Sequence, residues 1–149
     1  MDVIYIKGIR CIEKLNVFKF HSPDKKFDNN CQYAPLCFVF DVKREDLRQK
    51  SRLVLGGHVI DSSDHESYAS TVQYMYIRLL LTIAEKNQLK VMSGDVGNTF
   101  PNAYAKEKIY SRAGIEFGEG HGCIIEVVKA LYGLSTSERR WQLIFGDFI

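Results

Sequence analysis

The sequence has no strong excess of charge of either sign. Its 20 lysines and arginines are set against 18 aspartates and glutamates, so the formal net charge is only +2 at pH 7. A strongly basic chain would by itself indicate a nucleic-acid partner, but this balance does not, and such a claim has to rest on local sites. The composition, 46% hydrophobic and 26% charged over 149 residues, is that of one globular domain.

The four cysteines form no C-x-x-C pair, and no signal peptide accompanies them. We therefore expect reduced thiols in an intracellular protein of the cytoplasm or nucleus. A zinc site built from Cys31, Cys37, His58 and His65 is the alternative, although this spacing fits no compact zinc-binding pattern. No apolar run approaches the roughly 20 residues that a membrane-spanning helix needs, so we expect no membrane partner.

Alternating apolar residues predict short strands in the first half of the chain. We expect them at residues 3–6, 17–20, 36–42 and 52–55. The last two, joined by a charged stretch, would be the arms of a β-hairpin that ends at Gly56 and Gly57. Because strand side chains alternate with a period of two, Lys50 and Arg52 should lie on one face of it.

The clearest helix is predicted from Ser70 to about Asn87. Ser70 and Gln73 form a capping-box pattern, and the apolar stripe that follows predicts a core-facing surface. The residues from Leu89 to Val96 then predict a strand that ends in a glycine-punctuated corner at Asp95.

The last third of the chain predicts further strands at 109–110 and 123–128, separated by a flexible glycine-rich connection over 114–122. The segment 137–149 has a helix-compatible apolar pattern that stops without a capping glycine or a polar tail. So much apolar surface on one helix needs a partner, which we expect in a missing remainder of the same domain. The pattern as a whole predicts an α+β domain that is truncated at its C-terminus.

Three segments carry motifs. They are KSRLVLGGH at residues 50–58, GDVGNTFPNA at 94–103 and KALYGLSTSERRW at 129–141. In this order they resemble the reverse transcriptase domain of copia-type retrotransposons, with its motifs K-A-R-L-V-A-x-G-[FHY], D-V-x-x-A-[FY]-L-N-[GA] and K-A-L-Y-G-L-K-Q-S-P-R-x-W. The resemblance covers about residues 36–149. Residues 1–35 would be an N-terminal extension, which the fingers of the polymerase could include.

The resemblance implies polymerase fingers and part of a palm, with an antiparallel sheet packed on helices. It also implies an RNA-directed DNA polymerase, which transfers a nucleotide from a dNTP to a primer on an RNA or DNA template, with Mg²⁺ as cofactor. Asp95 stands at the first catalytic, metal-binding aspartate, and the Val96 carbonyl would complete the metal shell. The alternative is an aspartate that satisfies a turn beside Gly94. The implied partners are primer–template nucleic acid and the remainder of the polymerase or retroelement polyprotein.

Four further residues resemble nucleotide-binding positions of the family. Lys50 and Arg52 would hold the incoming triphosphate, Phe100 would exclude a sugar 2′-hydroxyl, and Gly133 would let the backbone approach nucleotide or template. The alternatives are a solvated hairpin arm for the two cations, a core aromatic for Phe100 and a plain turn for Gly133.

The sequence departs from the family pattern at several places. Thr99 replaces an alanine, Pro101 a leucine, Ser135 a lysine and Glu138 a proline. The tyrosine-x-aspartate-aspartate segment, which supplies the other metal carboxylates, does not occur in this chain. One carboxylate cannot build a two-metal site, so we expect no catalysis by the chain alone. The alternatives are a non-catalytic nucleic-acid-binding or interaction module derived from a retroelement, and the product of a decayed element.

Overall fold

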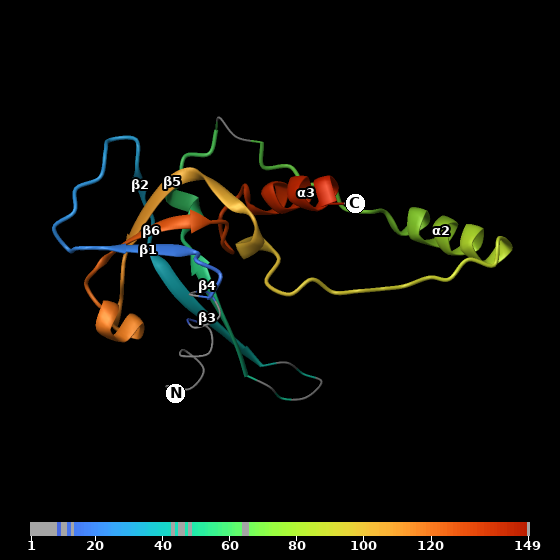
Figure 1. Cartoon of the computed structure of the whole chain (residues 1–149), viewed down its shortest axis with the longest axis horizontal. Coiled ribbons are helices and arrows are strands. Elements are labelled where there is room, and N and C mark those ends of the chain that lie inside the picture. The colour runs from blue at the N-terminus through green and yellow to red at the C-terminus, as the bar shows by residue number, and fades with distance from the viewer. Residues whose placement is uncertain are drawn as a thin grey trace.

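The computed structural model describes residues 9, 12, 14–42, 44, 47, 49–63 and 66–148, and it has a mixed α+β architecture (Figure 1). A four-stranded sheet has the order β1-β6-β5-β2, and β3 pairs with β4 in a separate two-stranded sheet. The strands are β1 Phe18–His21, β2 Gln32–Tyr33, β3 Leu36–Val42, β4 Gln49–Leu55, β5 Tyr104–Arg112 and β6 Ile124–Lys129. The α-helices are α2 Tyr74–Lys86 and α3 Ser137–Phe148, and short 3-10 helices are η1 Gly57–Val59, η2 Phe100–Asn102 and η3 Ile115–Gly120.

Most of the predicted strands are confirmed. The β3–β4 hairpin is antiparallel throughout, as are the pairs β1–β6 and β5–β6. The short β2, which the sequence did not indicate, pairs in parallel with β5. The strand predicted at residues 3–6 lies outside the described residues. The predicted α+β class is confirmed, and its sheets are antiparallel except at β2.

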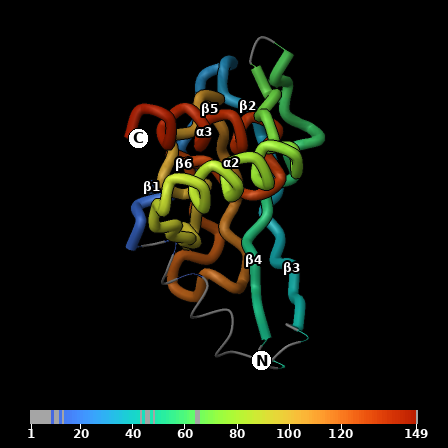
Figure 2. Tube along the Cα trace, turned by 90° about the vertical axis from the view of Figure 1, so that its right-hand side faces the viewer, coloured from blue at the N-terminus to red at the C-terminus, as the bar shows by residue number. Residues whose placement is uncertain are grey.

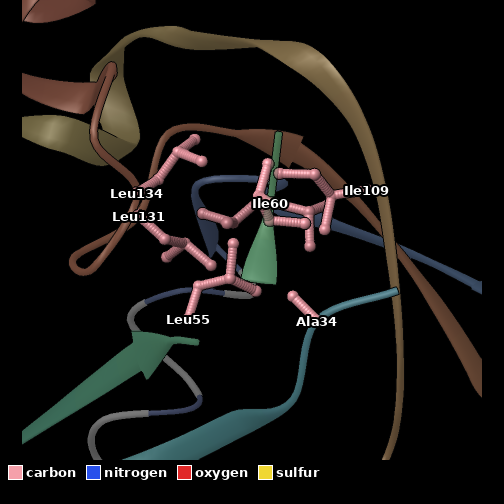
Figure 3. Close-up of a cluster of buried hydrophobic side chains, with 8 residues drawn as sticks. Ala34, Leu55, Ile60, Ile109, Leu131 and Leu134 are labelled. Atoms are coloured by element: carbon pink, nitrogen blue, oxygen red, sulfur yellow. The ribbon is translucent and has the colours of Figure 1, made fainter. Parts of the chain in front are cut away.

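The core lies where the inner end of the hairpin meets the four-stranded sheet (Figure 3). Its fully or nearly buried members are Val17, Ala34, Leu55, Ile60, Ile109, Val127, Leu131 and Leu134. Leu55, Ile109 and Val127 come from the inward faces of strands, and the other five come from the segments that follow or precede the strands and η1. Each buried leucine contributes about 1.5–3 kcal/mol relative to an exposed one, so this cluster holds the hairpin against the sheet.

The helix prediction is correct at its end but wrong at its start. α2 begins at Tyr74, four residues after Ser70, and no side chain caps it. The Ser70 hydroxyl instead accepts a hydrogen bond of 2.6 Å from Nε2 of Gln142 in α3. Asn87 follows the last turn, and its side-chain amide donates to the Ile83 carbonyl at 2.8 Å.

The predicted core-facing surface of α2 is wrong as well. α2 stands away from both sheets at one end of the chain's long axis (Figure 1), so in the view along that axis it lies in front of the other elements (Figure 2). Met75, Leu79 and Leu80 are exposed, and among the residues of α2 only Ala84 is buried. α2 and the segment after it border a shallow apolar groove of about 620 Å³.

The strand predicted from Leu89 to Val96 is absent from the described structure. These residues have no regular structure and are exposed. A strand needs a neighbour to pair its backbone groups, and no strand of the described residues pairs with this segment. Asp95 is therefore not at the end of a sheet strand, and that part of the prediction is wrong.

The C-terminal helix is confirmed as α3, which contacts η2 and β5. Leu143, Phe145 and Phe148 of α3 remain exposed. The glycine-rich stretch predicted as a flexible connection forms η3, with a kink at Gly118. No helix in the part of the chain that the structure describes is long and apolar enough to span a membrane.

Candidate nucleotide-binding site

The first and third motifs meet at the inner end of β4. The Leu55 amide donates a 2.8 Å hydrogen bond to the Tyr132 carbonyl, and Val54 bridges to Tyr132 in parallel. Gly133 has φ +91°, a conformation that favours glycine, and a Cβ there would overlap the Leu55 carbonyl oxygen. Likewise, a Cβ at Gly57 would overlap the Gly133 carbonyl. The two backbones are thus in direct contact, which only glycine at both positions allows.

Part of the second motif joins the same place. The Phe100 ring packs edge-on against the Tyr132 ring, with centroids 4.8 Å apart and planes at 64°. Backbone bonds hold this turn: Ala103 donates to the Phe100 carbonyl at 2.8 Å, and Ala130 donates to the Ala103 carbonyl at 2.9 Å. We call Leu55, Gly57, Phe100, Tyr132 and Gly133 the motif junction. The structure therefore brings together the predicted site residues Phe100 and Gly133.

Lys50 and Arg52 lie further out on β4. Their spacing in the paired strand places both on one face, as predicted. Lys50 stands opposite Asp41 of β3, and Nη1 of Arg52 lies 3.6 Å from Oδ2 of the same aspartate. The Arg52 and Asp41 side chains are 35% and 59% exposed, so solvent screens this ion pair. Both cations are accessible from water and anchored to the strand that ends in the motif junction.

Asp95 and Val96 lie apart from regular structure. Asp95 is exposed, and the Val96 carbonyl accepts a 2.9 Å hydrogen bond from the Thr99 hydroxyl. Thr99 stands where the family motif has an alanine, so this departure from the motif supplies a partner for the carbonyl. Among the residues that the structure describes, no three His, Cys, Asp or Glu side chains form a metal site. The Asp95 carboxylate and the Val96 carbonyl together do not make a divalent-cation site by themselves, since such an ion takes about six or more oxygen ligands.

Three buried polar side chains, Glu107, Thr136 and Ser137, form hydrogen bonds between the third motif and β5 or within that motif. Glu107, only 6% exposed, accepts a 2.7 Å hydrogen bond from the buried Thr136 hydroxyl, while its other oxygen has no partner in the described structure. The Ser137 hydroxyl donates to the Leu131 carbonyl at 2.6 Å. The period-two pattern of β5 could have indicated that Glu107 is buried, because Ile109 lies on the same face.

Arg139 and Arg140 already have partners within the chain. Arg139 forms a 3.0 Å ion pair with Glu66, and Nε of Arg140 donates to the Tyr104 carbonyl at 3.2 Å. Of the alternative zinc residues, Cys31 and Cys37 are free thiols, and His65 lies outside the described residues.

Residues 25–149 match the family model described as reverse transcriptase (RNA-dependent DNA polymerase). The chain belongs to this family. The Retrovirus-related Pol polyprotein from transposon TNT 1-94 of Nicotiana tabacum is 30% identical to it over 122 residues. These make up 75% of this chain but 9% of that polyprotein, so the chain spans a small part of its relative's length. No solved structure matches the chain. The resemblance to copia-type reverse transcriptases is confirmed, and the roles of individual site residues stay predictions.

Proposed function

We propose that the chain forms the dNTP-binding part of a retrotransposon RNA-directed DNA polymerase. The observation that carries this proposal is the motif junction, which joins Phe100 and Gly133 to the strand of Lys50 and Arg52. Nucleotidyl transfer is accelerated mainly by positioning and charge neutralisation, so a nucleotide site has to be built on fixed elements. A hairpin strand held by backbone contact with Tyr132 and Gly133, just after β6, meets that need.

Lys50, Arg52 and Phe100 would each contact a different part of the nucleotide. Lys50 would act on the triphosphate as a point charge, and Arg52 as a planar group that binds two phosphate oxygens. The exposed contact of Arg52 with Asp41 is worth at most about 1 kcal/mol, so a phosphate can replace it. Phe100, braced by Tyr132, would lie against the sugar and oppose a 2′-hydroxyl, and Gly133 would leave room for the base or template.

Asp95 and Val96 would contribute to a Mg²⁺ site whose other ligands come from another segment of the polymerase or its polyprotein. Once bound, the ion would neutralise charge on the transferring phosphoryl group. Because the chain lacks the aspartate pair, we expect no primer extension by it alone. Template-dependent extension by the purified chain, abolished in Asp95→Asn, would refute this expectation.

Titration calorimetry with dATP and ATP, in the presence of Mg²⁺, tests the site. The double variant Lys50→Gln/Arg52→Gln should bind dATP at least tenfold more weakly, because two charge contacts are lost. The matched variant Lys86→Gln/Lys90→Gln, with the same charge change at exposed positions in and after α2, should bind like the wild type. Phe100→Ala should reduce the preference for dATP over ATP. Unchanged dATP affinity in the Lys50/Arg52 variant would exclude the site.

A further inference from the structure

The four-stranded sheet has a basic face that the near-neutral net charge conceals. In β5 the exposed Lys106, Lys108 and Arg112 alternate with buried residues, so all three point away from the core. Lys19 of β1 pairs with Glu126 of β6, and Glu126 pairs with Tyr110 of β5, which places them on this same side. We call this side of the sheet the outer face.

The loop over residues 22–31 folds across the outer face. Phe27 stacks on Tyr110 with ring centroids 4.8 Å apart and planes at 7°. A cavity of about 500 Å³ lies at this place, and its lining includes Lys25 and Lys26 of the loop and Lys106 and Lys108 of β5. The loop and the sheet together therefore form a groove bordered by four lysines.

The charge of the outer face is positive after its acidic residues are counted. The basic residues are Lys19, Lys25, Lys26, Lys106, Lys108 and Arg112. The acidic ones are Asp24, Asp28, Glu126 and the buried Glu107, which also lines the cavity. Glu126 is held by a 2.8 Å contact with Nε2 of His21. Lys106 and Lys108 have no ion-pair partner in the part of the chain that the structure describes. These two lysines are free to meet an anion.

Exposed aromatic rings stand at both ends of this row of charges. Tyr33, 51% exposed, lies beside Tyr110 near one end of β5, and Tyr104, 58% exposed, begins the strand at the other. Five residues lie between Tyr104 and Tyr110, Lys106 and Lys108 among them, and the pairing of β5 with β6 shifts register between Tyr104 and Ile109. Tyr104 lines the same cavity as these two lysines. A positively charged groove with ring faces for stacking is the pattern that binds single-stranded nucleic acid without sequence preference.

We propose that the outer face binds single-stranded RNA or DNA, with its lysines along the phosphates and with Tyr33 and Tyr104 stacked on bases. No residue of the motif junction takes part, and neither Lys50 nor Arg52 does. The surface is therefore independent of the proposed dNTP site, and an experiment can refute one proposal without refuting the other.

Fluorescence anisotropy with fluorescein-labelled oligo(dT) and oligo(U) of about 12 nucleotides tests the surface at about 50 and 200 mM salt. The wild type should bind, and Lys106→Glu/Lys108→Glu should raise Kd at least tenfold. The slope of log K against log salt should fall in magnitude by about 1.4, since each lost phosphate contact contributes about 0.7 on single strands. The control Lys86→Glu/Lys90→Glu has the same charge change away from the outer face and should bind normally. Circular dichroism spectra should match the wild type for both variants.

A second set of variants separates stacking from charge alone. Tyr104→Ala should weaken binding about 5- to 100-fold, whereas Tyr104→Phe, which keeps the ring, should not. Lys50→Gln/Arg52→Gln should leave oligonucleotide binding unchanged, in contrast to its effect on dATP. Absence of binding by the wild type, or normal binding by Lys106→Glu/Lys108→Glu, would overturn the proposal. The proposal would also be overturned if Tyr104→Ala left oligonucleotide binding unchanged and phosphatidylserine vesicles displaced the labelled oligonucleotide as well as unlabelled oligonucleotide does. That result would indicate a general site for anionic surfaces.

Discussion

The motif junction and the segment 66–99, which we call the α2 arm, carry parts of one predicted site but hold them differently. At the junction, Leu55 is 1% exposed, and the backbones of the first and third motifs touch at Gly133. On the arm, Asp95 is exposed and lies in a segment without regular structure. Positions fixed by buried backbone contact have a defined geometry, whereas an exposed segment with few contacts opens at little free-energy cost.

The arm is attached to the rest of the chain at its base. Glu66 contacts Arg139, and Ser70 contacts Gln142, both in α3. Beyond these contacts, α2 has 13 residues and no side-chain cap, a length at which an isolated helix is only marginally stable in water. The second motif is thus divided, with Phe100 in the junction and Asp95 on the arm.

Replacing one glycine in each region should give the largest difference in unfolding free energy between the motif junction and the α2 arm. Gly133→Ala adds strain at φ +91° and a clash with the Leu55 carbonyl, and should cost about 2–6 kcal/mol of unfolding free energy. Gly94→Ala meets nothing within 4 Å, and its effect should stay below about 0.5 kcal/mol. Urea denaturation measures both. Equal effects would mean that the junction is no tighter than the arm.

Leucine truncation compares the two regions by burial. Leu131→Ala, at a position 1% exposed, should cost about 2–5 kcal/mol because it leaves a cavity in the core. Leu80→Ala on α2, at a position 63% exposed, should change stability by less than about 0.5 kcal/mol. If thermal melts show comparable losses of stability for the two variants, α2 packs against the sheets in solution.

A hydroxyl deletion gives a smaller contrast. Thr136→Val removes the hydrogen bond to Glu107 and leaves that buried carboxyl without a partner, at a cost of about 1–3 kcal/mol. Thr82→Val removes an exposed bond to the Arg78 carbonyl and should be nearly neutral in a denaturant titration. Thr136→Ser, which keeps the hydroxyl, should recover most of the loss. A neutral Thr136→Val would show that Glu107 has another partner in solution.

The smallest effect concerns pH. The hydrogen bond from His21, with Coulombic help from Lys19, His21 and Lys25, lowers the pKa of Glu126 below its usual value of 4.5 despite partial burial. A lowered folded-state pKa gives stability that is present above about pH 4.5 and is lost as pH falls through the folded pKa. Because the pair is partly exposed, the contribution is below about 1 kcal/mol. Glu126→Gln should flatten this acid limb in melts from pH 6 to 3, and an unchanged limb would count against the contact.

Local pattern predicted the elements whose signal is local. The strands predicted at residues 17–20, 36–42, 52–55, 109–110 and 123–128 and the helix predicted from residue 137 are confirmed. The start of α2 was wrong because Ser70 bonds with Gln142, 72 positions away. The prediction of a strand that ends at Asp95 was wrong because a strand forms only where another segment pairs with it, and local sequence does not indicate that partner. The close approach of Gly57 and Gly133 was also unpredictable, since nothing in either motif alone indicates the other.

Hydrogen–deuterium exchange, followed by mass spectrometry on the wild-type chain, tests the division between junction and arm most directly. We predict strong protection of peptides from β4, β5, β6 and residues 130–137, and near-complete exchange within seconds over 87–99, with α2 in between. Protection of 87–99 equal to that of β5 and β6 would contradict the account, because Asp95 would then lie on a fixed element of the folded protein.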